Sequence, residues 1–498
     1  AAATAQVSTP PPPKTFGDYE LLEETVVGLF AGAKQFAEKT YGHELEARAH
    51  ATWAQSPTID HWHTGELRHA PRQYEYTPDF VWSNTVQQAA SACDDYFEWN
   101  EFLTGGGTLN ASVDDDEITI AGAQPLPGEE VRVRVGERKR DYAFAETVEV
   151  LSPSPRRVHP PCEVFGVCGG CQLQHAEYPY QLEMKREILR EAFRRIGKTD
   201  VAPEIAPPLE PFGYRHRGRF RVDGEAVGFH ASLSHRLVPV SRCPLMIDAI
   251  NAVLPGLRGL DRFARVSEVQ VASDGVRASA SFPGVPFGKG IVEHLAGRTG
   301  GVLSGARFED RSWGEERITL PLDGISYSVS PRSFFQANWR MNRAMVRRIG
   351  AILGESTGAR LLDLYAGAGN FALPLAGKVR EVVAVEGEAR SFRELRGNVR
   401  ENALGNVRAV RSSVEAFRPE GRFDAVLLDP PRAGLSPKAL SRVREIAAGN
   451  VFYVSCDPST LARDVRSLSD RYDLASLEMH DFFPNTHHVE ALAALSAR

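Results

Sequence analysis

The chain of 498 residues has neither a long apolar run nor an excess of positive charge. Its longest apolar stretch, residues 26–33, is far shorter than the ~20 residues that a helix needs to span a bilayer. The first basic residue, Lys14, follows a proline run, unlike the basic start and apolar middle of a secretory signal peptide. We therefore expect a cytoplasmic protein that works away from membranes.

The net charge of -6 is opposite in sign to that of a typical nucleic-acid-binding protein. Two local basic runs stand out, although each alone is equally well interpreted as a solvated strand face. The runs are Arg132, Arg134, Arg138, Lys139 and Arg140, and then Arg215, Arg217, Arg219 and Arg221. Together they support the hypothesis of a surface that contacts phosphate groups.

Cysteine is scarce, with six residues in the whole chain, and a disulfide framework is not expected in a cytoplasmic protein of this length. Four of the six form a spaced group: Cys162, Cys168, Cys171 and Cys243. Four thiolates can hold either a tetrahedral zinc ion or an iron-sulfur cluster. The spacing alone leaves both metals open.

The composition changes along the chain and predicts several domains. Residues 1–95 show no chemistry and form an unassigned N-terminal extension. In residues 96–160, alternating segments at 117–120, 130–135 and 143–151 lie between Gly and Pro turns, which is typical of a small antiparallel barrel that binds oligonucleotides. Residues 161–330 predict a helix over 181–196 and then a mainly β domain, with strands at 217–222 and around 318–330.

The last third, residues 331–498, alternates helices and strands. Helical periodicity covers 341–353 and 392–403, and the expected strands are 360–365, 381–386, 424–428 and 451–455. Such alternation is the signature of a doubly wound parallel sheet. The chain is therefore predicted to be an α/β protein with a Rossmann-like C-terminal domain.

A glycine turn, Gly367 and Gly369, follows the first of these strands and allows the backbone to approach a ligand. Glu386 ends the next strand, where its carboxylate can accept both ribose hydroxyls. A nicotinamide dinucleotide would use the same geometry, but Asn370 and Phe371 replace the glycine and helix start expected under a pyrophosphate. S-adenosylmethionine has no phosphates, and we expect that cofactor instead.

The segment Asp429-Pro430-Pro431-Arg432 follows the third strand. Amino-methyltransferases often carry an aromatic residue at the fourth position, where it stacks on the base, so Arg432 argues against chemistry on an exocyclic amine. Two alternatives are kept: an amino- or small-molecule methyltransferase, and an RNA-binding metal protein with a degenerate methyltransferase domain.

Cys456 directly follows the fourth strand, at the sheet edge expected for the cofactor. A lone cysteine is normally a buried structural residue, but its place beside a Pro-fixed turn favours a catalytic thiol. Carbon 5 of uracil becomes nucleophilic once a thiolate has added to carbon 6. A base must later remove the proton from carbon 5, and the candidates are Glu490, His487 and His488. Candidate cations for activation of the thiol are Arg432 and Arg463.

Four motifs make residues 96–498 resemble the RNA 5-methyluridine methyltransferases. They are Asp363-Leu-Tyr-Ala-Gly-Ala-Gly-Asn-Phe371, Asp429-Pro-Pro-Arg432, Ser455-Cys-Asp-Pro458 and Phe483-Pro-Asn-Thr-His-His-Val-Glu490. The branch that looks most similar combines an N-terminal OB-like TRAM domain with a 4Fe-4S cluster and modifies 23S ribosomal RNA. Other relatives modify the T-loop of transfer RNA, which stays open as an alternative substrate.

The resemblance implies a role for individual residues. It makes Cys456 the nucleophile and Glu490 the base. The implied cofactor-binding residues are Gln336, Tyr365, Gly367, Gly369, Asn370, Glu386, Ser413 and Asp429, and the implied cluster ligands are Cys162, Cys168, Cys171 and Cys243. Ser413 stands where the family often has Asn or Asp. The resulting expectation is a monomeric enzyme with an RNA substrate, in which a TRAM domain at 96–160, a cluster-bearing β domain at 161–330 and a methyltransferase domain at 331–498 follow one another.

Overall fold

The computed structural model describes residues 118–121, 125–138, 143–232, 234–354 and 356–498. The expectations for residues 1–95 and for the start of the TRAM-like region lie outside these described residues. These residues divide into two compact units: one contains 118–121, 133–138 and 143–148, and the other contains 125–132, 149–232, 234–354 and 356–498. None of the helices within the described ranges has the length and apolar character needed to cross a bilayer.

Three strands form the first described sheet: β1 (Ile118–Ala121), β2 (Glu130–Arg138) and β3 (Ala143–Ser152), in the order β1-β3-β2. Their existence confirms the predicted strands. The pairing of β1 with β3 is parallel, however, whereas we expected antiparallel pairs. Alternating polarity determines which side chains share a face but not the direction of the neighbouring strand. Closure of this sheet into a barrel stays a prediction, because the preceding residues are not described.

The predicted helix at 181–196 is confirmed as α7 (Tyr178–Ala192), followed by a π-helical turn, Phe193–Gly197. It begins earlier than expected because Pro179 is accommodated in the first turn, where its missing N–H costs no hydrogen bond. Lys185 lies on the buried face of this helix and is itself fully buried. Its partner belongs to the C-terminal part of the chain.

The central region is mainly β, as predicted. A seven-stranded sheet has the order β11-β10-β9-β8-β5-β6-β7. Its strands are β5 (Arg217–Asp223), β6 (Ala226–His230), β7 (Leu237–Pro239), β8 (Glu268–Ser273), β9 (Ala278–Ser281), β10 (Leu303–Arg307) and β11 (Ser312–Gly314). Short helices, α8 (Asp248–Asn251), α9 (Leu254–Leu257) and α10 (Lys289–Arg298), pack with it around one apolar core.

The segment expected at 318–330 is a hairpin of β12 (Ile318–Leu322) and β13 (Ile325–Val329). Its two-residue turn, Asp323-Gly324, has positive φ at both positions, which matches the twist of the strands. The hairpin leads to α11 (Trp339–Leu353), where the Asn338 side chain accepts the Met341 N–H at 3.1 Å and caps the helix.

An eight-stranded sheet forms the C-terminal region, in the order β16-β15-β14-β17-β18-β20-β19-β4. The strands are β4 (Glu204–Ile205), β14 (Ser356–Leu364), β15 (Val379–Glu386), β16 (Val407–Arg411), β17 (Phe423–Leu428), β18 (Ala447–Ser455), β19 (Tyr472–His480) and β20 (Glu490–Ala497). The four predicted strands are confirmed. The sheet is mixed rather than wholly parallel, because β20 runs antiparallel to both β18 and β19.

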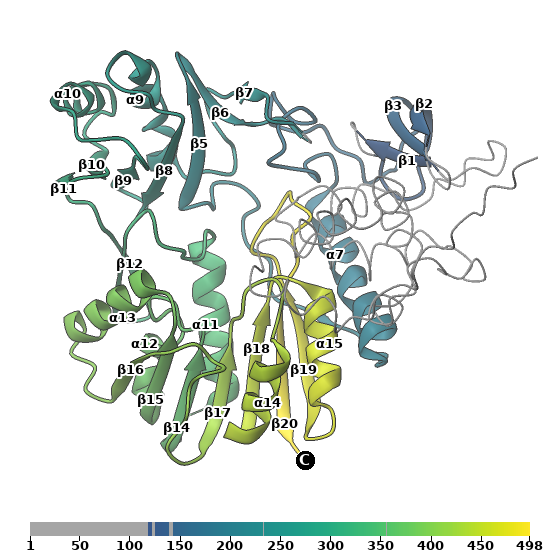
Figure 1. Ribbon diagram of the computed structural model, residues 1–498. Coiled ribbons are helices and arrows are strands. Elements are labelled where there is room, and N and C mark those ends of the chain that lie inside the picture. The colour runs from purple at the N-terminus through teal and green to yellow at the C-terminus, as the bar shows by residue number, and fades with distance from the viewer. Residues whose placement is uncertain (1–117, 122–124, 139–142, 233, 355) are drawn as a thin grey trace, which may run out of the picture. The chain divides into compact units, whose positions relative to one another are not determined.

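Helices cover both faces of this sheet, as in a Rossmann-like domain (Figure 1). The helices are α12 (Ala372–Leu375), α13 (Ala389–Glu401), α14 (Pro437–Ile446) and α15 (Pro458–Leu468). One core joins α11, α12 and α13 to strand residues such as Leu361 and Val382. Alternate strand residues are buried on the other face, where the Tyr453 hydroxyl donates to Asp464 of α15 at 2.7 Å. The carboxyl ends of the parallel strands are thus left for a site.

Candidate functional site

The turn that follows β14 has three residues with left-handed backbone conformation, Tyr365, Gly367 and Gly369, whose φ values are 64°, 57° and 99°. A Cβ added at Gly369 would lie 2.7 Å from Cγ of Leu373, so the turn requires glycine there. The Gly367 N–H donates to Oε2 of Glu386 at 2.8 Å. The turn and the end of β15 therefore hold each other at the carboxyl edge of the sheet.

Glu386 and Ser413 lie at this same edge. The second carboxylate oxygen of Glu386 accepts the N–H of Glu388 at 2.6 Å. A Cβ added at Gly387 would stand 3.7 Å from Cα of Ser413, which brings the segment after β16 next to the end of β15. Ser413 is exposed, and its hydroxyl accepts the Ala416 N–H at 3.3 Å. Glu386 and Ser413, both expected to contact the cofactor, are therefore close together. Each of them also stabilises a local turn.

Asn370 and Gln336 lie near the start of α11. The side chains of Asn370 and Asn342 exchange two hydrogen bonds, of 2.7 and 2.9 Å, and Asn342 is fully buried in α11. This amide pair fixes the end of the glycine turn against the helix. Gln336 is buried in the segment that connects β13 to α11.

Two carboxyl groups lie at the ends of neighbouring strands, with Asp363 fully buried and Asp429 half-buried. Oδ2 of Asp363, in β14, accepts the N–H of Ala372 at 2.9 Å. Burial raises the pKa of Asp363 well above its usual range, and the charges of Asp429 and Glu386 raise it further. Burial also raises the pKa of Asp429, to about 7. Sequence reasoning gave Asp363 no role of its own, although an acid inside an otherwise apolar strand was a signal that it supports the turn.

Cys456 and Glu490 are brought together by strand register. β18 pairs with β20 in antiparallel register, with Ser455 opposite Ala491. Cys456 directly follows Ser455 and Glu490 directly precedes Ala491, so both residues lie at the same end of this strand pair. The charge of Glu490 also acts on the Cys456 thiol, which agrees with their nearness. These two residues are far apart in the sequence but both lie at the carboxyl edge of the sheet, where the glycine turn also lies.

Burial shifts the pKa values of both groups towards the protonated form. Burial raises the pKa of the Cys456 thiol, and the charge of Glu490 raises it further, while Arg432 acts in the opposite direction. Burial raises the pKa of Glu490 to about 8, with Asp429 adding to the effect and Arg432 opposing it. The site therefore disfavours negative charge until a compensating group arrives.

The structure separates the two arginines that were candidates for activation of the thiol. Arg463 pairs with Asp464 at 2.9 Å and donates to the Ala433 carbonyl oxygen at 2.9 Å. The charge of Arg432 lowers the pKa of both Cys456 and Glu490. These charges favour Arg432 over Arg463 as the cation that activates the Cys456 thiol.

Two histidines were candidates for the base, together with Glu490. Burial lowers the pKa of His487 to about 3 and the pKa of His488 well below its usual range, with Arg432 contributing in both cases. Nδ1 of His487 lies 3.0 Å from Oε1 of Gln172, which gives this ring a structural contact. A group with so low a pKa is a weak base at neutral pH, so the electrostatics favour Glu490.

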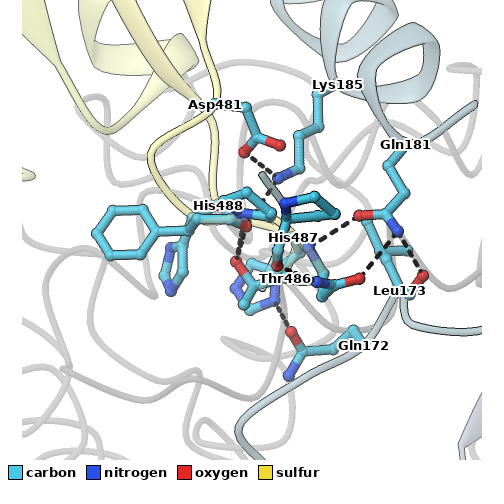
Figure 2. Close-up of polar contacts among 12 residues, drawn as sticks. Gln172, Leu173, Gln181, Lys185, Asp481, Thr486, His487 and His488 are labelled. Carbon is cyan, nitrogen blue, oxygen red and sulfur yellow. Dashed lines mark hydrogen bonds and ion pairs between the residues drawn. The ribbon is translucent and has the colours of Figure 1, made fainter. Parts of the chain in front are cut away.

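Figure 2 shows the loop 481–489, which leads into Glu490, against α7 and the segment that carries Gln172 and Leu173. The ammonium group of Lys185 lies 2.7 Å from Oδ1 of Asp481 and donates to the Phe483 carbonyl oxygen at 3.0 Å. Both members of the ion pair are buried. Removal of one partner would leave an uncompensated buried charge. This ion pair therefore holds the first residues of the loop in place.

The four spaced cysteines surround one cavity of about 190 Å³, whose lining includes Cys162, Cys168, Cys171 and Cys243. Burial raises the pKa of Cys168 to about 11, and Cys243 and Cys162 raise it further. Within the described part of the chain, no three His, Cys, Asp or Glu side chains lie close enough together to bind a single metal ion. The sequence prediction that these thiols share one site agrees with the cavity, and the group they hold stays a prediction.

A family model described as tRNA (Uracil-5-)-methyltransferase matches residues 310–421 and 419–498 of this chain. The 23S rRNA (uracil(1939)-C(5))-methyltransferase RlmD of Alkalilimnicola ehrlichii is 37% identical over 408 residues, which cover 76% of this chain and 92% of that relative. The enzyme of the same name from Methylococcus capsulatus is 34% identical over 415 residues, with coverage of 77% and 93%.

One solved structure is similar over most of the chain. It is the Pyrococcus abyssi tRNA (uracil-54, C5)-methyltransferase in complex with S-adenosyl-L-homocysteine, with a TM-score of 0.64 and 26% identity. The match covers 77% of this chain and 97% of that chain.

The raised pKa of Glu490 predicts a pH-dependent stability. The carboxyl stays protonated up to about pH 8 in the folded protein, but it ionises near 4.5 when unfolded. Folding therefore takes up a proton between these pH values, and stability falls as the pH rises through this window. Glu490→Gln removes this loss, so its stability relative to the wild type should rise between pH 5 and 8.5 by on the order of 3 kcal/mol.

Urea denaturation at both pH values measures this change. Glu293→Gln, on the exposed side of α10, is the control and should shift neither midpoint relative to the wild type. A Glu490→Gln variant with the same relative stability at pH 5 and 8.5 would contradict the assignment of a buried, protonated Glu490.

Proposed function

This chain belongs to the RNA (uracil-5-)-methyltransferase family, and we propose that it methylates carbon 5 of a uridine in 23S ribosomal RNA. S-adenosylmethionine is the proposed methyl donor, Cys456 the nucleophile and Glu490 the base. The observation that supports this proposal is the pairing of β18 with β20, which ends with Ser455 opposite Ala491 and so brings Cys456 and Glu490 to the same end of the strand pair. An amino- or small-molecule methyltransferase has no use for such a pair.

The groups around the glycine turn fit the proposed methyl donor. The turn has no third glycine under a phosphate, and Gly367 and Gly369 expose backbone at the end of β14. Glu386 is held where a carboxylate can accept ribose hydroxyls, and Asp429 stands at the next strand end. Further proposed contacts are Gln336, Tyr365, Asn370 and Ser413. When bound, S-adenosylmethionine supplies an electrophilic methyl group to this edge of the sheet.

The first proposed step is addition to the uracil ring. The Cys456 thiol loses its proton, favoured by the charge of Arg432, and its sulfur forms a bond to carbon 6. The electron pair of the carbon 5–carbon 6 double bond moves into the ring carbonyl as an enolate. Carbon 5 is then nucleophilic and takes the methyl group, with release of S-adenosylhomocysteine.

Elimination completes the reaction. The Glu490 carboxylate accepts the proton from carbon 5, and this electron pair restores the double bond while the bond between carbon 6 and sulfur breaks. The thiolate of Cys456 is regenerated and the methylated uridine leaves. A carboxyl with a pKa of about 8 is well matched to this transfer, because the best general bases have pKa values near the working pH.

Ribosomal RNA is the preferred substrate because two relatives that the match covers to more than 90% of their own length are named as 23S rRNA enzymes. Transfer RNA is the second candidate, because the similar solved structure is a transfer RNA enzyme. Arginines on one face of β5 offer phosphate contacts. Arg217 stacks on the ring of Phe335 at 5.2 Å, and Arg219 and Arg221 pair with Glu268 on the neighbouring strand.

We further propose that Cys162, Cys168, Cys171 and Cys243 hold a 4Fe-4S cluster. The support is a donor set of four thiols around one cavity. Each thiolate of such a cluster binds a different iron atom, so the thiolates stand further apart than around a single zinc ion. The methylation steps need no electron transfer, so the proposed role of this site is to hold its surrounding segments together.

The proposed domains keep the boundaries predicted from the sequence: a TRAM-like domain at 96–160, a central β domain at 161–330 and a methyltransferase domain at 331–498.

The proposed location is the cytoplasm, because the proposed substrate is ribosomal RNA. All groups of the proposed site lie on one chain, which agrees with a monomeric enzyme.

Covalent catalysis predicts trapping by a fluorinated substrate. Target RNA that carries 5-fluorouridine should form a stable adduct with the enzyme, because fluorine cannot leave carbon 5 as a proton. Cys456→Ala should form no adduct and should lower methyl transfer at least about a thousandfold. Glu490→Gln is the matched control, since trapping needs addition and methyl transfer but no base. Denaturing gels measure the adduct, and trapping by Cys456→Ala at the wild-type level would rule out this nucleophile.

The proposed substrate predicts where 5-methyluridine disappears. In cells that lack this protein, nucleoside mapping should show the loss of one 5-methyluridine in 23S rRNA and none in transfer RNA. Re-expression of the wild type should restore the modification, and re-expression of Cys456→Ala should not. A loss confined to the T-loop of transfer RNA would assign the second candidate substrate instead.

The cluster assignment predicts both colour and iron content. Protein purified without oxygen should absorb near ~400 nm and contain iron, and Cys243→Ser should lose both. Cys456→Ser is the matched control and should keep both, because Cys456 does not line the cavity. Colourless wild-type protein that contains zinc would show that the four thiols bind the other metal.

A further inference from the structure

The shape of the loop 481–489 depends on contacts from outside the loop. Asn485, at its centre, has a left-handed backbone with φ of 67°, a conformation that asparagine adopts more readily than most residues. The Asn485 carbonyl oxygen accepts the N–H of Gln172 at 3.0 Å, and its N–H donates to Oε1 of Gln181 at 2.8 Å. The Tyr214 hydroxyl donates to the Pro484 carbonyl oxygen at 3.0 Å. The loop is therefore held from outside the C-terminal sheet.

Gln172 makes a second contact, to the end of the loop nearest Glu490. Its side-chain amide donates through Nε2 to the Gly169 carbonyl oxygen at 2.9 Å, which turns Oε1 toward His487 (Figure 2). Nδ1 of His487 lies 3.0 Å from this oxygen. Since an amide oxygen only accepts hydrogen bonds, Nδ1 carries the proton. Gln172 therefore selects both the orientation and the tautomer of the His487 ring.

His487 connects this contact to the proposed chemistry. It lies three residues before Glu490, and its ring stands 4.5 Å from the ring of His488. Nδ1 of His488 is 3.3 Å from Nη2 of Arg432, whose charge acts on Glu490 and Cys456. A displaced His487 would therefore disturb both the start of β20 and the position of the neighbouring cation.

We propose that Gln172 is a positioning residue for Glu490 and acts through His487. The inference rests on the proposed function, because it concerns the base that removes the proton from carbon 5. Gln172 also follows Cys171 directly, so whatever fixes Cys171 in its cavity also fixes this contact. The segment that contains Cys162, Cys168 and Cys171 is thereby coupled to the proposed base through one side chain.

A misplaced base slows elimination but leaves addition and methyl transfer intact. The covalent complex between Cys456 and methylated uridine should then accumulate with ordinary RNA, whereas a merely destabilised enzyme would form less complex and less product together. The ratio of complex to product therefore separates a positioning role from a structural one.

The test uses Gln172→Met, which keeps the length of the side chain and removes its hydrogen bonds. The enzyme is mixed with uridine-containing target RNA and S-adenosylmethionine labelled in the methyl group, and denaturing gels measure the labelled protein–RNA complex. Gln172→Met should lower kcat about tenfold and raise the ratio of complex to product by a similar factor, with KM for RNA and S-adenosylmethionine nearly unchanged. An unchanged ratio would overturn the proposal.

His487 provides an independent pair of variants, in case Gln172→Met folds poorly. His487→Phe should accumulate the complex in the same way. His487→Asn can place an amide N–H near the position of Nδ1 and should restore most of the lost elimination, although it cannot act as a base. Equal loss of elimination in both variants would contradict the positioning role.

Glu490→Gln distinguishes failure of this inference from failure of the proposed function. It should accumulate the labelled complex and lower kcat by about a hundredfold or more. If Glu490→Gln accumulates the complex and Gln172→Met does not, only the role of Gln172 is wrong. If Glu490→Gln accumulates no complex, the proposed base itself is wrong.

Discussion

The antiparallel pairing of β18 with β20 is the constraint on which the rest of the site depends. In a wholly parallel sheet, neighbouring strands deliver side chains to one edge through separate turns, and each turn sets its own position. An antiparallel neighbour instead holds one of its residues directly opposite the last residue of β18. The residues next to this pair then lie at the same end of the two strands. The nearness of Cys456 to Glu490 therefore depends on the backbone hydrogen bonds of the sheet, which hold positions more rigidly than a loop does.

The same pairing also requires that the loop 481–489 be held in place at the carboxyl edge of the sheet. The loop must cross the carboxyl edge to bring the chain from β19 back into β20, and its buried backbone groups need hydrogen-bond partners. The loop's own residues satisfy only some of them, as where Thr486 donates to the Phe483 carbonyl oxygen at 3.2 Å. Other partners come from Gln172, Gln181 and Tyr214, all of which precede the C-terminal region in the sequence. This dependence explains why a segment with no catalytic group of its own contacts the loop that leads to the proposed base.

The limits of sequence reasoning follow from the same geometry. A strand followed by a glycine turn is a local pattern, so the position of Gly367 and Gly369 could be predicted, and so could Cys456 at the end of its strand. The direction of β20 could not, because burial on both faces removes the alternation that marks a strand, and direction depends on its neighbours. The partner of His487 lies 315 residues away, and no local pattern encodes such a contact. With Glu490 and the two histidines adjacent in sequence, only the burial and charges of the fold separate them.

The burial of Cys456 and Glu490 also has a consequence for the order of events. Two neighbouring negative charges in a buried site are strongly disfavoured, and the charge of Glu490 adds to burial in raising the pKa of Cys456. The proposed reaction needs a charge on sulfur during addition and on the carboxylate during elimination, never on both at once. Formation of the bond to carbon 6 consumes the charge on sulfur, and ionisation of Glu490 then becomes less costly. A site that penalises two simultaneous charges therefore favours addition before elimination.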